Sequence, residues 1–412
     1  MAGPAFPLPT MKLQLVAQEN SVPVQGQLIA SVASVASPSS ALADQVRNAA
    51  AALFLAMGDG KDGSPNLSMV SLPTNASWSE SSDAGQSSIA PGSPSTIESG
   101  EFEPSDFDEE SLLDDSTSVG SSVYGHSYRN GRRYHKYRHG RYPIPNDETE
   151  QNREDMLHAM MMEVTNGRLF YAPIDENPQK IVDLGTGTGI WAIEVGDVFP
   201  SAEVTGLDLS PIQPVWVPPN VKFLVDDVED TWLNGDNIDF VHMRNMIPIL
   251  SSPVALLKQV FDNLKPGGWV ELQDVDGAVH CDDGTLPSDW PLVKFCDLMV
   301  EAFAKLGTRS HAAMFGGNYL HEAGFVNIQH RTAKLPYGTW PADKTTRLVG
   351  LYYRTAAEDF FPAMGAIQMP LLGWSKEEME VFFAQCRSCM RDESVHAYGL
   401  MHFWSAQKPE RC

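Results

Sequence analysis

A glycine-rich turn near the middle of the sequence contains the first residues that could do chemistry. The segment Asp183-Leu-Gly185-Thr-Gly187-Thr-Gly189 lies between the apolar run KIVDL and the apolar helical pattern of residues 190–198. Glycines let a backbone turn approach a ligand closely, and the helix that follows begins with N–H groups lacking intrahelical partners. This arrangement predicts a small-molecule site, in which Asp183 either organises the ligand or braces the loop.

The spacing of these glycines favours one class of ligand. A dinucleotide fingerprint, G-x-G-x-x-G, would need glycine at position 190, which is Ile190, so the sequence reads G-x-G-x-G instead. The interpretation shifts from NAD to S-adenosylmethionine (SAM), whose methionine end carries an ammonium and a carboxylate but no pyrophosphate. An NAD-dependent dehydrogenase remains as an alternative, although no catalytic Tyr-Lys pair stands out.

Acidic residues follow the next two strand-like segments. Asp208 lies at the end of EVTGLDL, nineteen residues after Gly189, where a carboxylate accepts hydrogen bonds from both ribose hydroxyls in doubly wound nucleoside sites. Asp226 and Asp227 follow VKFLV, where an acidic side chain would accept from the adenine amino group while an apolar neighbour packs on the ring. Asp227 with Val228 is the better candidate pair for adenine.

Candidates for a base or an acceptor anchor come after the two later strands. His242 and Arg244 end IDFVHMR, and Asp274 and Asp276 follow WVELQ; doubly wound sheets bind ligands at these carboxyl ends. For His242 the alternative is a buried histidine whose hydrogen bonds are satisfied within the fold. Methyl transfer from a sulfonium is an in-line displacement that the protein mainly positions, so no catalytic residue is mandatory.

The elements that must hold these residues alternate between strand and helix. Apolar β-type runs and helical patterns follow one another from Lys180 to Asp276, and Leu264-Lys-Pro-Gly-Gly is typical of a helix end and turn before the fifth strand. Two more strand candidates, 326–335 and 402–407, bracket an apolar helical insertion at about 340–391. We expect an α/β fold with a doubly wound, seven-stranded, mainly parallel sheet.

Upstream of this core the composition changes twice. Residues 1–123 are acidic and rich in Ser, Pro and Gly, which predicts a disordered tail, with a marginal helix at 41–57. Residues 124–145 interleave aromatic and basic side chains, as in YGHSYRNGRRYHKYRHGRY, and predict either a nucleic-acid or nuclear-import patch or a connector docked on acidic surfaces. The methyl-transfer domain is expected at 146–410, with its core at 180–276 and a capped helix from about 147 to 162.

Charge and cysteine content exclude several classes. The net charge of −24 makes direct nucleic-acid binding unfavourable, because such binding needs clustered Lys and Arg. Five cysteines are few and odd in number, and Cys386-Arg-Ser-Cys389 lacks a second pair, so we expect no metal and no disulfide framework. Without a secretion signal or an apolar run of about 20 residues, we expect a cytoplasmic or nuclear protein that is neither secreted nor membrane-bound.

The motifs together resemble one family. DLGTGTGIWAIEV followed by LDLSPIQP, the preceding GRYPIPNDETEQNREDMLHAM, LKPGGWVELQD and the closing HAYGLMHFWSAQKP are similar to the fungal LaeA-like methyltransferases, over roughly residues 128–409. The loop departs from the family at Thr186, where Cys is common. The acidic tail lies outside the resemblance.

The resemblance implies a SAM-dependent methyltransferase that acts on a small molecule of secondary metabolism. The alternative it implies is a nuclear regulator of secondary metabolism that works through protein partners. Neither the acceptor, the atom that is methylated nor the oligomeric state can be read from these motifs.

Overall fold

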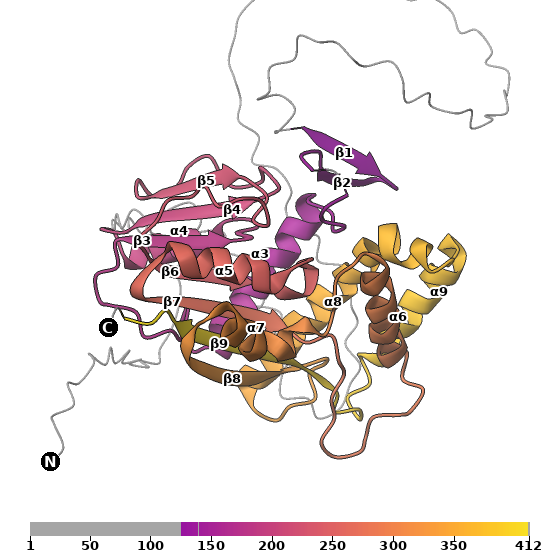
Figure 1. The fold of residues 1–412 in the computed structure, drawn as a ribbon. Helices are drawn as coiled ribbons and strands as arrows, with labels where there is room; N and C mark the ends of the chain where they lie inside the picture. Colours follow the sequence, from indigo (N-terminus) through magenta and orange to yellow (C-terminus); the bar gives the residue numbers. More distant parts are fainter. Residues whose placement is uncertain (1–124, 139, 411–412) are drawn as a thin grey trace, which may run out of the picture. The chain divides into compact units, whose positions relative to one another are not determined.

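The computed structural model describes residues 125–138 and 140–410 (Figure 1). The predicted disordered tail and the predicted helix at 41–57 lie outside the described residues. Within the described part, a two-stranded sheet precedes a seven-stranded sheet that has helices on both faces.

The large sheet has the strand order β5-β4-β3-β6-β7-β9-β8. Its first five strands are parallel, β9 runs antiparallel to β7, and β8 runs antiparallel to β9. The predicted doubly wound, seven-stranded, mainly parallel sheet is therefore confirmed. The strands are β3 (Lys180–Leu184), β4 (Glu203–Asp208), β5 (Val221–Val225), β6 (Ile238–Arg244), β7 (Leu264–Val275), β8 (Val326–Pro336) and β9 (Tyr398–Gln407).

The helices cover the sheet because successive strand residues point to opposite faces. In β3, Val182 packs in the cluster shared with α5 and α7, and its neighbour Ile181 packs in the cluster shared with α4. Helix α3 packs with α8 against β8 and β9. These helices are α3 (Glu148–Val164), α4 (Ile190–Val198), α5 (Pro253–Asn263), α7 (Gly316–Ala323) and α8 (Lys344–Leu371).

A separate apolar cluster joins three helices beside the sheet (Figure 1). The predicted insertion at 340–391 consists of α8 and α9 (Lys376–Cys389), and α6 (Pro291–Lys305), which the sequence pattern did not single out, packs with both of them. Phe295 of α6, Phe361 of α8 and Phe383 of α9 lie in mutual ring contact. The helical module is therefore larger than the predicted insertion, because α6 comes from a different part of the chain.

One local element was not predicted, and one local prediction needs correction. The connector contains a β-hairpin, β1 (His126–Arg129) and β2 (Arg132–His135), because Asn130 and Gly131 both adopt positive φ, the signature of a two-residue hairpin turn. The turn expected at Pro-Gly-Gly is part of β7, which begins at Leu264, and the pairing register with β6 shifts beside it. The predicted domain boundaries at 123 and 145 stay predictions.

Candidate functional site

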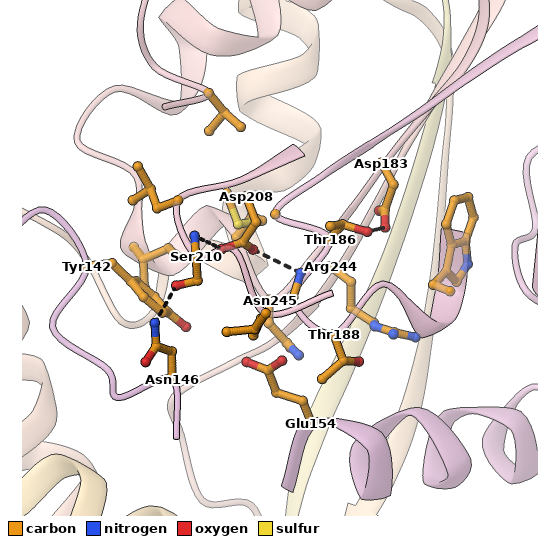
Figure 2. Close-up of a pocket in the computed structure, with 18 of the residues that line it drawn as sticks. Tyr142, Asn146, Glu154, Asp183, Thr186, Thr188, Asp208, Ser210, Arg244 and Asn245 are labelled. Atoms are coloured by element: carbon orange, nitrogen blue, oxygen red, sulfur yellow. Dashed lines mark hydrogen bonds between the residues drawn. The ribbon is translucent and has the colours of Figure 1, made fainter. Parts of the chain in front are cut away.

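The carboxyl ends of β3, β4 and β6 meet at one edge of the sheet, where a pocket opens (Figure 2). We call it the polar pocket. Helix α3 also contributes to it. Its main lining segments are residues 185–188, 208–210, 226–229 and 244–246. The residues predicted from the glycine turn and from the next strands are thus brought together at one place.

The shape of the loop after β3 requires glycine at Gly187. Its φ is +56°, and an added Cβ would lie 2.6 Å from Oε2 of Glu154 on α3. Gly185 and Gly189 also adopt positive φ, a region that side chains with a Cβ disfavour. The loop therefore brings its backbone close to a carboxylate from a helix more than thirty residues upstream.

Asp183 and His242 form a buried pair beneath the loop. One Asp183 oxygen accepts from the Thr186 hydroxyl at 2.6 Å, and the other lies 2.7 Å from His242 Nδ1. The His242 ring stacks on Trp191 at 3.7 Å between centroids. Burial lowers the pKa of His242 although Asp183 acts in the opposite direction. This geometry favours the bracing role for Asp183. His242 is fixed by Asp183 and Trp191, but its hydrogen bonds are not all satisfied, because its buried Nε2 has no hydrogen-bond partner among the described residues.

Asp208 connects the end of β4 with the glycine loop. Its Oδ2 accepts from the Gly187 N–H at 2.9 Å, and its Oδ1 accepts from the Ser210 N–H at 2.8 Å (Figure 2). Burial raises the pKa of Asp208 to about 6, although these backbone hydrogen bonds lower it. A carboxylate oxygen has more than one acceptor site, so both oxygens still have capacity for a ligand.

Helix α3 supplies a carboxylate that the sequence pattern did not identify. Burial, followed by the charge of Glu150, raises the pKa of Glu154 to about 8. Among the described residues, Glu154 Oε2 is buried and has no hydrogen-bond partner. Next to it, the Thr188 hydroxyl donates to Asp155 at 2.7 Å, which connects the loop to α3. The adjacent acidic pair directly before the Met-rich half of α3 was the available signal.

The segment after β5 is held by an arginine from the connector. Arg141 Nε lies 3.1 Å from Asp227 Oδ2, and the same guanidinium pairs with Glu229. Asp227 Oδ1 also accepts from the Glu229 N–H at 3.0 Å. Val228 packs against the core and lines the pocket beside Asp226. Asp227 and Val228 therefore lie at the pocket, but much of the Asp227 carboxylate is already paired.

Two other arginines of the connector are paired too. Arg132 donates to both oxygens of Asp147, the residue that caps α3, and Arg138 pairs with Asp230. This is the arrangement that the docking interpretation of the connector predicts.

The four candidates for a base or an acceptor anchor, which follow β6 and β7 in the sequence, do not lie in one site. Arg244 lines the polar pocket, and its Nη2 lies 3.1 Å from His158 Nδ1; burial lowers the pKa of Arg244. Asp274 is buried, accepts from the Ile247 N–H at 3.0 Å and lies outside the lining of the pocket; burial raises its pKa to about 7. Asp276 lines a second cavity.

This second cavity, the apolar chamber, adjoins the polar pocket. The chamber is lined mainly by apolar side chains of α3, α6 and α8, among them Met160, Phe295 and Phe361. The two cavities share six lining residues: Tyr142, Arg153, Leu157, Arg244, Asn245 and Ile249. A ligand in the polar pocket and a ligand in the chamber would therefore touch the same side chains.

Metal sites and membrane-spanning helices were searched for among the described residues alone. Within 125–138 and 140–410, no His, Cys, Asp and Glu side chains gather in a group of three that could hold a metal, and Cys386 and Cys389 lie on α9. None of the helices in these ranges has the length and apolar character that crossing a membrane requires.

Comparisons with known proteins fit this geometry. A family model described as a methyltransferase domain matches residues 156–330. Methyltransferase pytC of Aspergillus terreus is 40% identical over 308 residues, which cover 74% of this chain and 95% of that protein. Secondary metabolism regulator LAE1 of Cochliobolus heterostrophus is 34% identical, covering 68% and 94%, and protein-methionine methyltransferase laeA of Emericella nidulans is 33% identical, covering 68% and 76%.

The sheet order, the glycine loop and the family match define a class I SAM-dependent methyltransferase. SAM is its cofactor. The identity to pytC and to the LaeA proteins is above 30% over more than two thirds of this chain. The chain belongs to the LaeA-like family of fungal methyltransferases.

Proposed function

We propose that this enzyme transfers the methyl group of SAM to a small apolar acceptor of secondary metabolism, bound in the apolar chamber. The observation that carries the proposal is the shared wall between the polar pocket and the chamber. Two reactants held across one wall have the proximity that an in-line displacement needs. The link to secondary metabolism is supported by the relative that is named a secondary metabolism regulator, LAE1.

The residues of the polar pocket fit SAM. Asp208 is proposed to accept from the ribose hydroxyls, because its two oxygens lie side by side at the end of β4. Glu154 is proposed to face the ammonium group, because a buried carboxylate oxygen with no partner among the described residues suits a cation. Asp227 and Val228 are proposed to flank the adenine ring.

The remaining residues have supporting roles in this proposal. Gly185, Gly187 and Gly189 let the loop approach the methionine end of the cofactor, and Asp183 braces that loop from below. Arg244 supplies a positive charge where the methionine carboxylate would lie. Bound SAM supplies the electrophilic methyl group, and the protein positions the acceptor and excludes water from it.

A metabolite comparison tests the proposal. The parent strain should contain a small molecule that carries one methyl group more than its precursor. A strain that lacks this protein should lose this methylated molecule. Reintroducing the wild-type protein should restore it, and reintroducing Asp208→Ala should not. If no small molecule differed by a methyl group between the strains, the small-molecule acceptor would have to be abandoned.

A second candidate is methylation of a protein by a regulator of secondary metabolism. It is favoured by the names of two relatives, a secondary metabolism regulator and a protein-methionine methyltransferase. Ion pairs at Arg138 and Arg141 neutralise part of the connector's basic charge, which weakens the case for nucleic-acid binding. Incubation of the purified protein with labelled SAM and a methionine-containing peptide separates the candidates, because only the second predicts labelled peptide.

A further inference from the structure

The wall of the chamber carries one carboxylate, which has two histidines beside it. Asp276 follows β7, is 5% exposed, and is the one Asp or Glu among the described residues that line the chamber. His280 Nε2 lies 2.9 Å from Asp276 Oδ2, and His402 Nε2 lies 3.7 Å from the same oxygen. The Ala278 N–H donates to Asp276 Oδ1 at 3.0 Å. The carboxylate is therefore fixed in position at the chamber wall.

The surroundings keep Asp276 charged and keep the thiol and phenol groups of the chamber wall neutral. Burial alone would raise the pKa of Asp276, but the nearby imidazoles of His402 and His280 and the Ala278 N–H outweigh burial and hold the pKa below its ordinary value. Burial raises the pKa of Cys296 to about 12 and also raises the pKa values of Tyr337 and Tyr353. At neutral pH the chamber thus presents one anionic oxygen pair among neutral side chains, with Arg153 and Arg244 at the wall shared with the polar pocket.

A path leads from this carboxylate to solvent. His280 is about one third exposed and stacks on Tyr398. On the other side, His402 Nδ1 lies 3.0 Å from His330 Nε2, and His330 is at the surface, stacked on Trp404 at 3.6 Å. Residues from the loop after β7 and from β8 and β9 therefore converge on one carboxylate, and imidazoles are suited to passing protons near neutral pH.

The chamber also has a polar corner near Asp276. Ser310 Oγ lines the chamber, is buried, and has no partner among the described residues. The hydroxyls of Tyr337 and Tyr353 lie 3.3 Å apart on the chamber wall. Most of the rest of the lining is apolar and includes aromatic and Met side chains such as Phe360 and Met299. These features suit a flat apolar body that carries a hydroxyl group.

We propose that Asp276 is the catalytic base for O-methylation of a hydroxylated aromatic acceptor, with His280 as the route of the proton to solvent and His402 as a positioning residue. This inference rests on the proposed function. A C–O bond forms between the acceptor oxygen and the methyl carbon while the S–C bond of SAM breaks. The hydroxyl proton passes to Asp276 and leaves through His280 to water. As the C–O bond forms, the hydroxyl becomes a strong acid, so a carboxylate with a lowered pKa still accepts its proton.

Methylation of a hydroxyl group differs from methylation of a thioether in whether the acceptor must lose a proton. A methionine-like sulfur has no proton to lose, so it would gain nothing from a carboxylate with a path to solvent. A phenol loses one proton for each methyl group it receives. The geometry around Asp276 therefore favours hydroxyl acceptors over sulfides.

The test uses three probes with the full-length protein and labelled SAM: 2-naphthol, the more acidic 4-nitrophenol, and methyl 2-naphthyl sulfide. We expect wild type to methylate both phenols but not the sulfide. Asp276→Asn should lower kcat for 2-naphthol about 100-fold, with KM and SAM affinity within threefold of wild type. The loss should be much smaller for 4-nitrophenol, because this phenol is already ionised near neutral pH and needs no base.

Controls keep the outcomes distinct. Asp289→Asn, an exposed residue of the same loop, should behave like wild type, and thermal melting with SAM titration should show that Asp276→Asn is folded. His280→Gln should give a smaller loss of kcat on 2-naphthol, again recovered with 4-nitrophenol. An equal loss on both phenols would mean that Asp276 is only structural, and methylation of the sulfide alone would overturn the hydroxyl class.

One further result concerns the proposed function itself. If none of the three probes were methylated by wild-type protein that binds SAM, the small-molecule acceptor would fail, and the role of Asp276 would fail with it. If wild type methylates a phenol and Asp276→Asn does so at the same rate, the proposed function stands and the role of Asp276 alone is refuted.

Discussion

The polar pocket and the apolar chamber share a wall but are built in opposite ways. The polar pocket takes most of its lining from loops that directly follow successive parallel strands, and its functional groups are carboxylates and backbone N–H groups. The chamber collects apolar side chains from α3, α6, α8 and segments between them. The cofactor is the same throughout the family, so its site can be recognised from short motifs at the ends of successive strands. The acceptor surface is instead formed by helices that come from separate parts of the chain.

The largest expected effect tests the polar side of this comparison. Asp208→Ala should weaken SAM binding at least about 100-fold, because it removes charge-assisted hydrogen bonds that each contribute about 1.5–3 kcal/mol. Isothermal titration calorimetry measures the change. Asp197→Ala, at the exposed end of α4, is the matched control and should bind like wild type. Equal affinity of the Asp208 and Asp197 variants would place the ribose elsewhere.

A pH dependence sharpens the role of α3. Because the pKa of Glu154 is raised to about 8, the side chain is protonated at pH 6, and a cationic ligand must displace that proton. SAM affinity of wild type should therefore rise with pH, by up to about tenfold per unit below pH 8. Glu154→Gln should flatten this profile. A pH-dependent affinity that is identical in both proteins would exclude contact between Glu154 and the ammonium.

The same group has a predictable effect on stability. A carboxyl whose folded pKa lies above its unfolded value stabilises the fold only while it is protonated, so its contribution is lost as pH rises from the ordinary value toward 8. In the absence of SAM, Glu154→Gln should therefore melt at a higher temperature than wild type at pH 9, with a smaller difference at pH 5. Thermal denaturation at the two pH values measures this, and a constant difference would contradict it.

A substitution in the apolar chamber should have a smaller effect, and this effect should be on turnover of the acceptor. Ala357→Phe adds a ring to the chamber wall on α8, and overpacking of this kind costs about 1–3 kcal/mol. Turnover of 2-naphthol, measured as kcat/KM, should fall about tenfold, while SAM affinity should stay within twofold. Val381→Phe, on the exposed face of α9, serves as the control. A parallel loss of SAM affinity would show that the two cavities are not separable.

The smallest effect concerns the connector. Arg141→Gln removes a partly exposed guanidinium that pairs with Asp227 and Glu229, and ion pairs of this exposure contribute about 0.2–1 kcal/mol. Urea denaturation should show a loss in that range. SAM affinity should fall by only about threefold, because the segment after β5 loses one support but keeps its backbone hydrogen bonds. A loss as large as that of Asp208→Ala would make the connector part of the cofactor site itself.

Local patterns were enough to predict the core of the fold and part of the site. Alternating apolar segments placed β3 to β6 and α4 within a residue or two, because period-two and period-3.6 patterns depend on which face is buried. The hairpin at Asn130-Gly131 carried a recognisable signal that the charge pattern concealed. The start of β7 was displaced because a Pro-Gly-Gly segment is typical of a turn, whereas pairing with β6 extends the strand through it.

The sequence alone determined which strand ends carry acidic residues and that a glycine loop precedes α4, since both follow from neighbours along the chain. Only the tertiary structure decided that Glu154 faces Gly187, that Asp183 is paired with His242, and that α6 joins α3 and α8 around a chamber. It also brought His280 and His402 onto Asp276. Such contacts join residues far apart in sequence, so they are set by sheet order and helix packing and leave no local pattern to read.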